Sequence, residues 1–150
     1  MNKTIAWCSL IVTAGVIIAI SAIRPELLSD GNAFFKELVG ANLLLVCGVI
    51  LTITLASAGQ IHLSLNEIES RHGGAFLHKT RSGVHHSAYF LIALFLASVI
   101  LVTVKHYFDT PRVEAFFNGA ALFILLWMVL IMASLTRLIF AIKPHHPDAS

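Results

Sequence analysis

Histidine is the residue type in this sequence with the widest scope for chemistry. The chain contains eight histidines, and neutral imidazole binds zinc, copper or haem iron when several ligands converge. His62 and the adjacent His85 and His86 would approach one another if two neighbouring helices carried them. However, no HExxH or CxxC spacing accompanies these histidines. We therefore predict no metal site and no cofactor. A pH-responsive surface and a metal or haem site are the alternatives to plain solvation of the imidazoles.

No other pattern in the chain predicts catalysis. Gly73 precedes Lys79-Thr80 by the spacing of a phosphate-binding loop, but His78 stands where that motif has its second glycine. Asp, Glu, Lys and Arg are absent from the centres of the long apolar runs, whereas ion-coupled transporters usually carry such a residue there. The formal net charge of +2 is too small to indicate nucleic-acid binding. We predict a protein that is not an enzyme and has no nucleic-acid partner.

The distribution of charge predicts the elements that carry these residues. The chain of 150 residues is 57% hydrophobic and 12% charged, against about 25% charged in ordinary soluble domains. Asp, Glu, Lys and Arg are absent from four runs, namely 4–23, 38–66, 82–104 and 115–136. A helix needs roughly 20 apolar residues to cross a bilayer, and these runs lack the alternation of a barrel strand. The first run also has some features of a secretory signal, with Ala19-Ile20-Ser21 as its small-residue site.

The sequence thus predicts an all-α membrane protein, a bundle of four transmembrane helices. Residues 1–150 form one domain, with helices at about 4–23, 33–71, 84–107 and 112–142. Asn32 is the expected cap of the second helix, and Pro111 is expected in the first turn of the fourth. The second helix is long enough to extend into the cytoplasm beyond the bilayer. Basic residues are slightly more numerous on the side of the termini, which favours cytoplasmic termini and a bacterial inner membrane.

Two groups of residues are candidates for contacts. In the projection of the second helix, the apolar stripe Ile61, Leu65 and Ile68 runs beside a polar stripe. A basic loop follows the projection and is expected to meet a protein partner or anionic lipid headgroups. The candidate contact residues are His62, Asn66, Glu69, Arg71, His78, Lys79 and Arg81. A second group consists of small and amide residues within the helices, namely Asn42, Gly48, Thr52, Ala56 and Asn118. They are expected to pack helices within the subunit, to pack one subunit against another, or to line a pore.

Two functions are compatible with this pattern. The first is a non-enzymatic membrane scaffold or sensor that self-associates and recruits or regulates a cytoplasmic protein through the 60–86 region. A bacterial two-component membrane system, including anti-phage defence, is the setting that this architecture suggests. The alternative is a homo-oligomeric pore or membrane-depolarising effector, which needs a wet path between helices. Both functions imply membrane lipids and further copies of the chain as partners.

Overall fold

The fold consists of helices joined by short connections. The computed structural model describes residues 3–72, 78–108 and 110–141, and within these ranges it contains no strand. The prediction of an all-α chain is confirmed. The elements are α1 (Lys3–Ile23), the 3-10 turn η1 (Pro25–Leu27), α2 (Ala33–Glu37), the π-helical segment η2 (Leu38–Asn42), α3 (Leu43–His72), α4 (His78–Lys105) and α5 (Pro111–Ala141).

Three helical stretches are long and apolar enough to cross a membrane. They are Ala33–Ser70 with 38 residues, Thr80–Lys105 with 26 and Pro111–Phe140 with 30. A shorter apolar stretch, Trp7–Ile23, belongs to α1. Large aliphatic and aromatic side chains are exposed along all four long helices. Such a surface suits lipid better than water, because exposed apolar patches of this extent are rare on soluble monomers.

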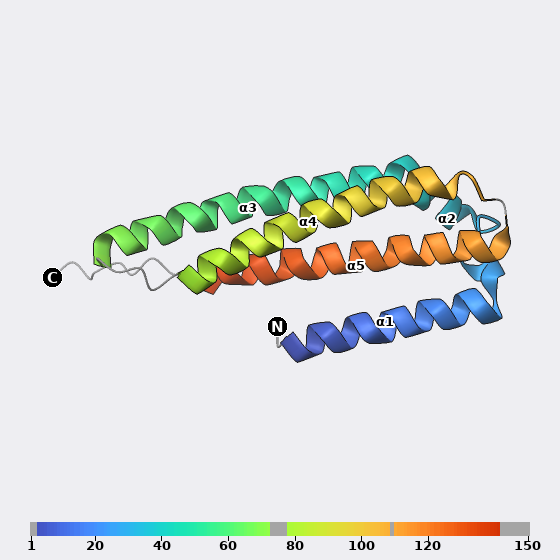
Figure 1. Ribbon diagram of the computed structural model, residues 1–150, viewed down its shortest axis with the longest axis horizontal. Coiled ribbons are helices and arrows are strands. Elements are labelled where there is room, and N and C mark those ends of the chain that lie inside the picture. The colour runs from blue at the N-terminus through green and yellow to red at the C-terminus, as the bar shows by residue number, and fades with distance from the viewer. Residues whose placement is uncertain (1–2, 73–77, 109, 142–150) are drawn as a thin grey trace.

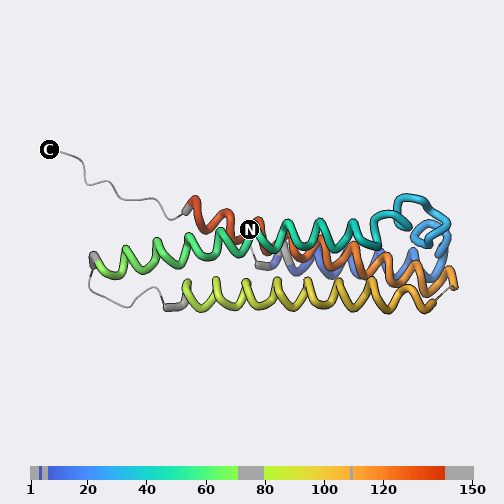
Figure 2. Tube along the Cα trace, turned by 90° about the horizontal axis from the view of Figure 1, so that it is seen from above, coloured from blue at the N-terminus to red at the C-terminus, as the bar shows by residue number. Residues whose placement is uncertain are grey.

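The long helices run side by side (Figure 1). α5 packs against α1, α3 and α4, and α3 packs against α4. The η1 turn and α2 lie together at one end of the bundle, where α4 ends and α5 begins. At the opposite end α3 extends beyond the described ends of α4 and α5 (Figure 2). The two ends of the bundle therefore differ: one is closed by short elements and the other carries a projecting helix.

The second predicted helix is interrupted, which the sequence did not reveal. Val39 (φ −90°, ψ 66°) and Gly40 (φ −158°, ψ −137°) have non-helical backbone and produce a kink between α2 and α3. The predicted start of this helix is confirmed, since the Asn32 side chain accepts a hydrogen bond from the Phe34 backbone N–H. The predicted Pro111 start of the last helix is also confirmed. An isolated glycine in an apolar run gives little warning of a kink.

The core lies along the contacts that α5 makes with the other helices. Leu43, Leu91 and Met128 are fully buried there, one each from α3, α4 and α5. Gly119 of α5 packs tightly against α1, because a Cβ at this position would clash with Ile17 Cγ2. Small residues permit such close contact between helices. A second, smaller core cluster joins α3 to α4 and α5 nearer the projecting end.

Candidate functional sites: polar clusters at the two ends of the bundle

The closed end of the bundle contains a partly buried polar network, the Asp30 cluster, formed by Asp30, Lys105, Glu114 and Asn118. Lys105 Nζ lies 2.7 Å from Asp30 Oδ1, and Asn118 Nδ2 donates to the same oxygen at 2.9 Å. The Asp30 backbone N–H donates to Glu114 Oε2 at 3.1 Å. Asn118 Nδ2 also donates to the Leu28 carbonyl at 2.6 Å. The cluster therefore joins the turn after α1 to the end of α4 and the beginning of α5.

Local structure explains why these side chains converge. Glu114 and Asn118 are four residues apart in α5, so they share the helix face directed at the turn. Lys105 is in the last turn of α4, where a cation interacts favourably with the helix dipole. The turn itself is held by the Ser29 hydroxyl, which donates to the Glu26 carbonyl at 3.3 Å. The turn after α1, the end of α4 and the beginning of α5 thus each place a polar group beside the Asp30 side chain.

Burial makes the Asp30 cluster a structural element rather than a surface contact. Asn118 is fully buried and Lys105 is 8% exposed. Burial raises the pKa of Asp30, but hydrogen bonds from Asn118 and Lys105, together with the charges of Lys105 and Lys36, outweigh burial and lower it. Asp30 is therefore held as a carboxylate. Its two side-chain donors leave it poorly suited to act as a base.

A recess of about 250 Å³ opens beside this cluster. The kink supplies Val39 and Gly40 to its wall, and the Val39 carbonyl lies 3.5 Å from Lys105 Nζ. Lys36, His106 and Glu114 also line the recess. The kink between α2 and α3 thus exposes backbone to a buried ammonium group, which partly compensates for the loss of helical hydrogen bonding.

The projecting end carries a second polar cluster, the Arg81 clasp, formed by Asn66, Glu69 and Arg81. Arg81 of α4 forms an ion pair with Glu69 of α3 at 2.7 Å and donates a hydrogen bond to Asn66 Oδ1. The side chains of Arg81 and Glu69 are 29% and 18% exposed. Because Asn66 and Glu69 lie one helical turn apart, a single guanidinium reaches both.

The apolar stripe of α3 packs inside the same hairpin. Ile61 and Leu65 are each 2% exposed, and they form the second core cluster with Val84 of α4 and Leu135 of α5. The apolar stripe was expected to contact another subunit or a partner. At Ile61 and Leu65 it instead packs against other helices of the same chain. Together with the Arg81 clasp, it fixes α3 on α4 as a hairpin.

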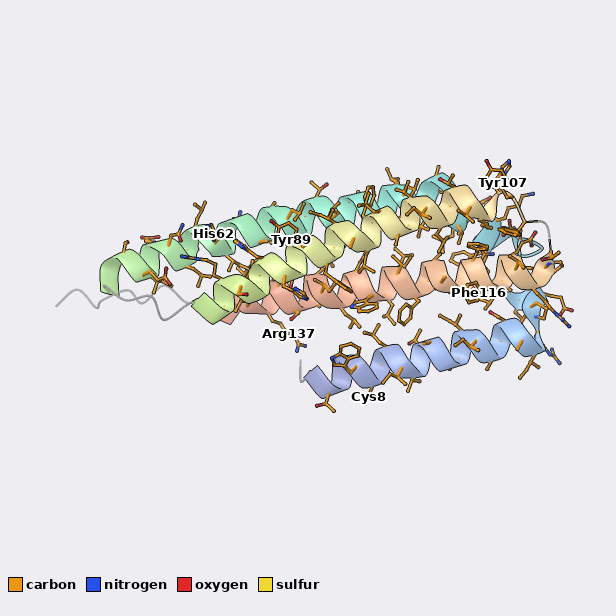
Figure 3. The ribbon with its side chains drawn as sticks, viewed as in Figure 1. Cys8, His62, Tyr89, Tyr107, Phe116 and Arg137 are labelled. Atoms are coloured by element: carbon orange, nitrogen blue, oxygen red, sulfur yellow. The ribbon has the colours of Figure 1, made fainter. Side chains whose placement is uncertain are left out.

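His62 and His85 lie opposite each other between α3 and α4, with ring centroids 5.4 Å apart. Figure 3 labels His62 on the projecting half of α3. His62 Nδ1 is buried and has no hydrogen-bond partner among the described residues. Those residues contain no group of three or more His, Cys, Asp or Glu side chains arranged to hold a metal ion. The pair supplies two of the ligands that a metal centre would need.

Three of the predicted contact residues lie in helical backbone whose side chains are outside the described part of the structure. They are Arg71 at the end of α3 and His78 and Lys79 at the start of α4. Residues 73–77 between them also lie outside the described residues. Among the predicted contact residues, the structure thus brings together Asn66, Glu69 and Arg81, with His62 one turn before Asn66.

The predicted packing and pore residues fall into different environments. Thr52 and Ala56 are exposed on α3, and the Thr52 hydroxyl donates to the Gly48 carbonyl of its own helix at 2.8 Å. A Cβ at Gly48 would lie in ordinary contact with Phe95 of α4. Asn42 donates to the carbonyl of Glu37, five residues earlier in the chain, at 3.1 Å. Asn118 alone of the five predicted residues joins separate segments by side-chain hydrogen bonds.

Sequence reasoning identified Asn118 but missed its partners Asp30, Lys105 and Glu114. Asp30 and Lys105 are 75 residues apart, so no local motif connects them. The available signal was positional. Asp30 lies in the charged stretch 24–37, and Lys105 and Glu114 lie in the charged stretch 105–114. Both stretches join charge-free runs at the same end of the predicted bundle. No match to this chain was found among protein-family models, curated proteins or solved structures. Function is accordingly inferred from the two polar clusters and the lengths of the helices.

Proposed function

We propose that this chain is a four-helix protein of a bacterial inner membrane, with both termini in the cytoplasm. In this arrangement α1 is the fourth span, beside the three longer apolar helices. The Asp30 cluster lies at the outer surface and the Arg81 clasp at the cytoplasmic surface. We further propose that the protein is a non-enzymatic scaffold or sensor. It self-associates and recruits or regulates a cytoplasmic protein through the 60–86 region.

The projection of α3 carries this proposal. α3 has 30 residues, which corresponds to about 45 Å against a hydrocarbon core of about 30 Å. Its first carboxylate after the apolar run is Glu67, so the last turns are the part suited to water. The Arg81 clasp secures the base of these turns to α4. A rigid hairpin outside the bilayer presents a defined surface to a partner, because its conformational entropy is already lost.

The charge of the hairpin indicates the chemistry of the partner. Arg71, Lys79 and Arg81 lie at or near its tip, and Arg81 is already paired with Glu69. Arg71 and Lys79 are therefore proposed to contact an acidic partner surface, while Arg81 positions the hairpin. The architecture suits the membrane subunit of a two-component system, with anti-phage defence as one setting, because a separate soluble chain would supply any catalytic output.

The test compares charge removal at the two ends of the bundle. Cells express the tagged full chain, and cross-linked complexes are purified from membranes and identified by mass spectrometry. The triple variant Arg71→Ser, Lys79→Ser, Arg81→Ser is expected to lose a soluble protein that the wild type retains, while self-association persists. The matched control is Arg24→Ser, Lys36→Ser, Arg112→Ser, which removes three exposed cations from the other end. Recruitment that survives the first triple substitution undiminished contradicts the proposal.

A homo-oligomeric pore or membrane-depolarising effector is the second candidate. The observation that favours it is the exposure of Thr52 and Ala56 on α3, since small residues on a lipid-facing helix allow a second copy to pack closely. Conductance across a reconstituted bilayer would test it. Asn42→Leu is expected to reduce conductance, because it removes the exposed amide at the end of η2, directly before α3. Bilayers that stay electrically silent over a range of voltage and pH contradict it.

A further inference from the structure

Two recesses lie end to end between α4 and α5. The first, of about 400 Å³, is lined by Trp7, His86, Ser87, Phe90, Trp127 and Ile131. The second, of about 390 Å³, is also bordered by Ser87 and continues toward the cytoplasmic end of α5. We call the two together the α4–α5 groove. Each recess falls within the roughly 300–1,000 Å³ typical of ligand pockets.

Both recesses of the groove are mainly apolar, and most of its polar groups lie in the second recess. Its inner half is aromatic: the Trp127 ring lies 4.9 Å from Phe90 and 6.5 Å from Trp7, measured between centroids. Its outer half contains the hydroxyls of Thr80, Ser87 and Ser134 and the guanidinium of Arg137. The groove therefore offers an apolar channel with hydroxyl groups and one cation, Arg137, in its outer half.

Arg137 is the charged side chain among the described residues that line the groove. It is exposed, and within the described ranges it has no ion pair with a carboxylate. Figure 3 shows its side chain leaving α5 on the side where α1 lies. Arg81, the next cation on α4, is directed at Glu69 of α3 instead. Arg137 is therefore available to an anion that enters the groove.

The depth of these groups matches the polarity of a phospholipid. Arg137 directly follows the charge-free run 115–136, which places it where α5 would leave the hydrocarbon core. Trp127 precedes it by ten residues, or about 15 Å of helix toward the bilayer centre. A phosphate at the level of Arg137 would direct its acyl chain toward Trp127.

We propose that the α4–α5 groove binds one anionic phospholipid of the cytoplasmic leaflet. Arg137 pairs with the phosphate, the Thr80 and Ser134 hydroxyls donate to its oxygens, and one acyl chain packs against Phe90 and Trp127. This proposal rests on the membrane insertion proposed above. A second copy of the chain is a poorer occupant, because its charge-free runs would leave Arg137 unpaired in lipid. The net positive charge of the outer half selects a headgroup with net negative charge.

The position of the tryptophans provides the test. The chain has two tryptophans, and both line the apolar half of the groove. The full chain is reconstituted in phosphatidylcholine vesicles that contain a small fraction of phosphatidylglycerol brominated on its acyl chains. A parallel sample contains the same fraction of brominated phosphatidylcholine. We expect the brominated phosphatidylglycerol to quench tryptophan fluorescence several-fold more efficiently, because it concentrates in the groove.

Substitutions assign the preference to Arg137. Arg137→Gln is expected to lower the relative affinity for phosphatidylglycerol about fivefold, the equivalent of about 1 kcal/mol for one arginine at an anionic surface. Arg137→Lys retains the charge and should retain most of the preference. Arg112→Gln removes an exposed arginine from the opposite end of α5 and should leave quenching unchanged. Trp7→Phe should preserve the preference through Trp127.

Each other outcome overturns a specific claim. Equal quenching by the two brominated lipids, or a preference that survives Arg137→Gln, overturns the anionic-lipid site. Absence of quenching by either lipid, in protein that floats with the vesicles, shows the groove to be covered by another copy and also overturns it. Protein that does not float with the vesicles refutes membrane insertion itself, so the two proposals fail by different observations.

Discussion

Lys105 Nζ lies 2.7 Å from Asp30 Oδ1 and thereby joins the last residue of α4 to the turn that follows α1. The same carboxylate oxygen accepts a hydrogen bond from Asn118 of α5. One oxygen atom therefore connects three segments that are remote in sequence. The side chains of Lys105 and Asp30 are 9% and 29% exposed, so this contact is partly shielded from water and contributes more than a fully exposed ion pair.

Lys105→Met is expected to destabilise the fold by about 1–3 kcal/mol, between the values for exposed and buried ion pairs. Methionine retains most of the apolar stem but leaves the Asp30 carboxylate without its cation. The measurement is thermal unfolding of the purified protein in lipid discs. Arg112→Met, at an exposed position of the same end, is the control and should change stability by less than about 0.5 kcal/mol. Equal effects of the two substitutions would contradict a structural role for the pair.

Asn118→Asp tests the amide at almost constant volume. The substitution removes the donors to the Leu28 carbonyl and to Asp30, and it places a second carboxylate beside the first. We expect a loss of about 1–3 kcal/mol from the unpaired buried carbonyl, with a further loss from the repulsion between carboxylates. Denaturation at neutral pH measures the total loss in the free energy of unfolding. A smaller loss at acid pH, where one carboxyl is protonated, would identify the repulsive part.

Stability should fall in acid because of Asp30. Burial raises the pKa of this carboxyl, but the hydrogen bonds from Asn118 and Lys105 and the charges of Lys105 and Lys36 lower it below its ordinary value of 3.8. The unfolded chain therefore binds the proton first as the pH falls. The contribution of the Asp30 charge to the free energy of unfolding is complete above about pH 5, and it is lost as the pH falls through the pKa of Asp30 in the folded protein. Asp30→Asn should be less stable than wild type at neutral pH, and the difference should shrink below about pH 4. A difference that stays constant over this range would show that the charge of Asp30 is not the cause.

Gly119→Ala is expected to weaken the packing of α1 on α5 by about 1–3 kcal/mol, as overpacking of a core usually does. The new methyl group would clash with Ile17 Cγ2, and a β-branched isoleucine has few rotamers with which to avoid it. Gly15→Ala in α1 is the matched control, since no heavy atom lies within 4 Å of a Cβ there. Alanine at this position should be neutral or stabilising, because it favours the helix. Comparison of the two unfolding midpoints separates steric clash from helix propensity.

The helices were predictable because apolar runs and their end signals are local. The Asn32 cap and the Pro111 start depend on a few neighbouring residues, and each was confirmed. These features follow from composition and spacing alone.

The polar pairings were not predictable, because they depend on which helix ends meet. Arg81 was expected to contact lipid or a partner, which stays a prediction, but the pairing of its guanidinium with Glu69 of α3 was not foreseen. The polar stripe that contains Glu69 was recognised, but not the α4 residue opposite it. The kink at Gly40 was missed for a related reason: its backbone conformation is accompanied by a contact between the Val39 carbonyl and Lys105, a residue far away in the sequence.

The packing of α1 on α5 has a consequence for the order of synthesis. α1 precedes the other helices of the structure in the sequence, yet the long helix it packs against is α5. The surface of α5 that contacts α1 includes Gly119. The Ser21 hydroxyl of α1 donates to the Ala115 carbonyl of α5 at 3.5 Å. During synthesis, α1 is therefore complete long before this surface of α5 has formed, whereas α3 and α4 can pair as soon as both are complete. The ribosome must complete α5 before α1 acquires this native neighbour.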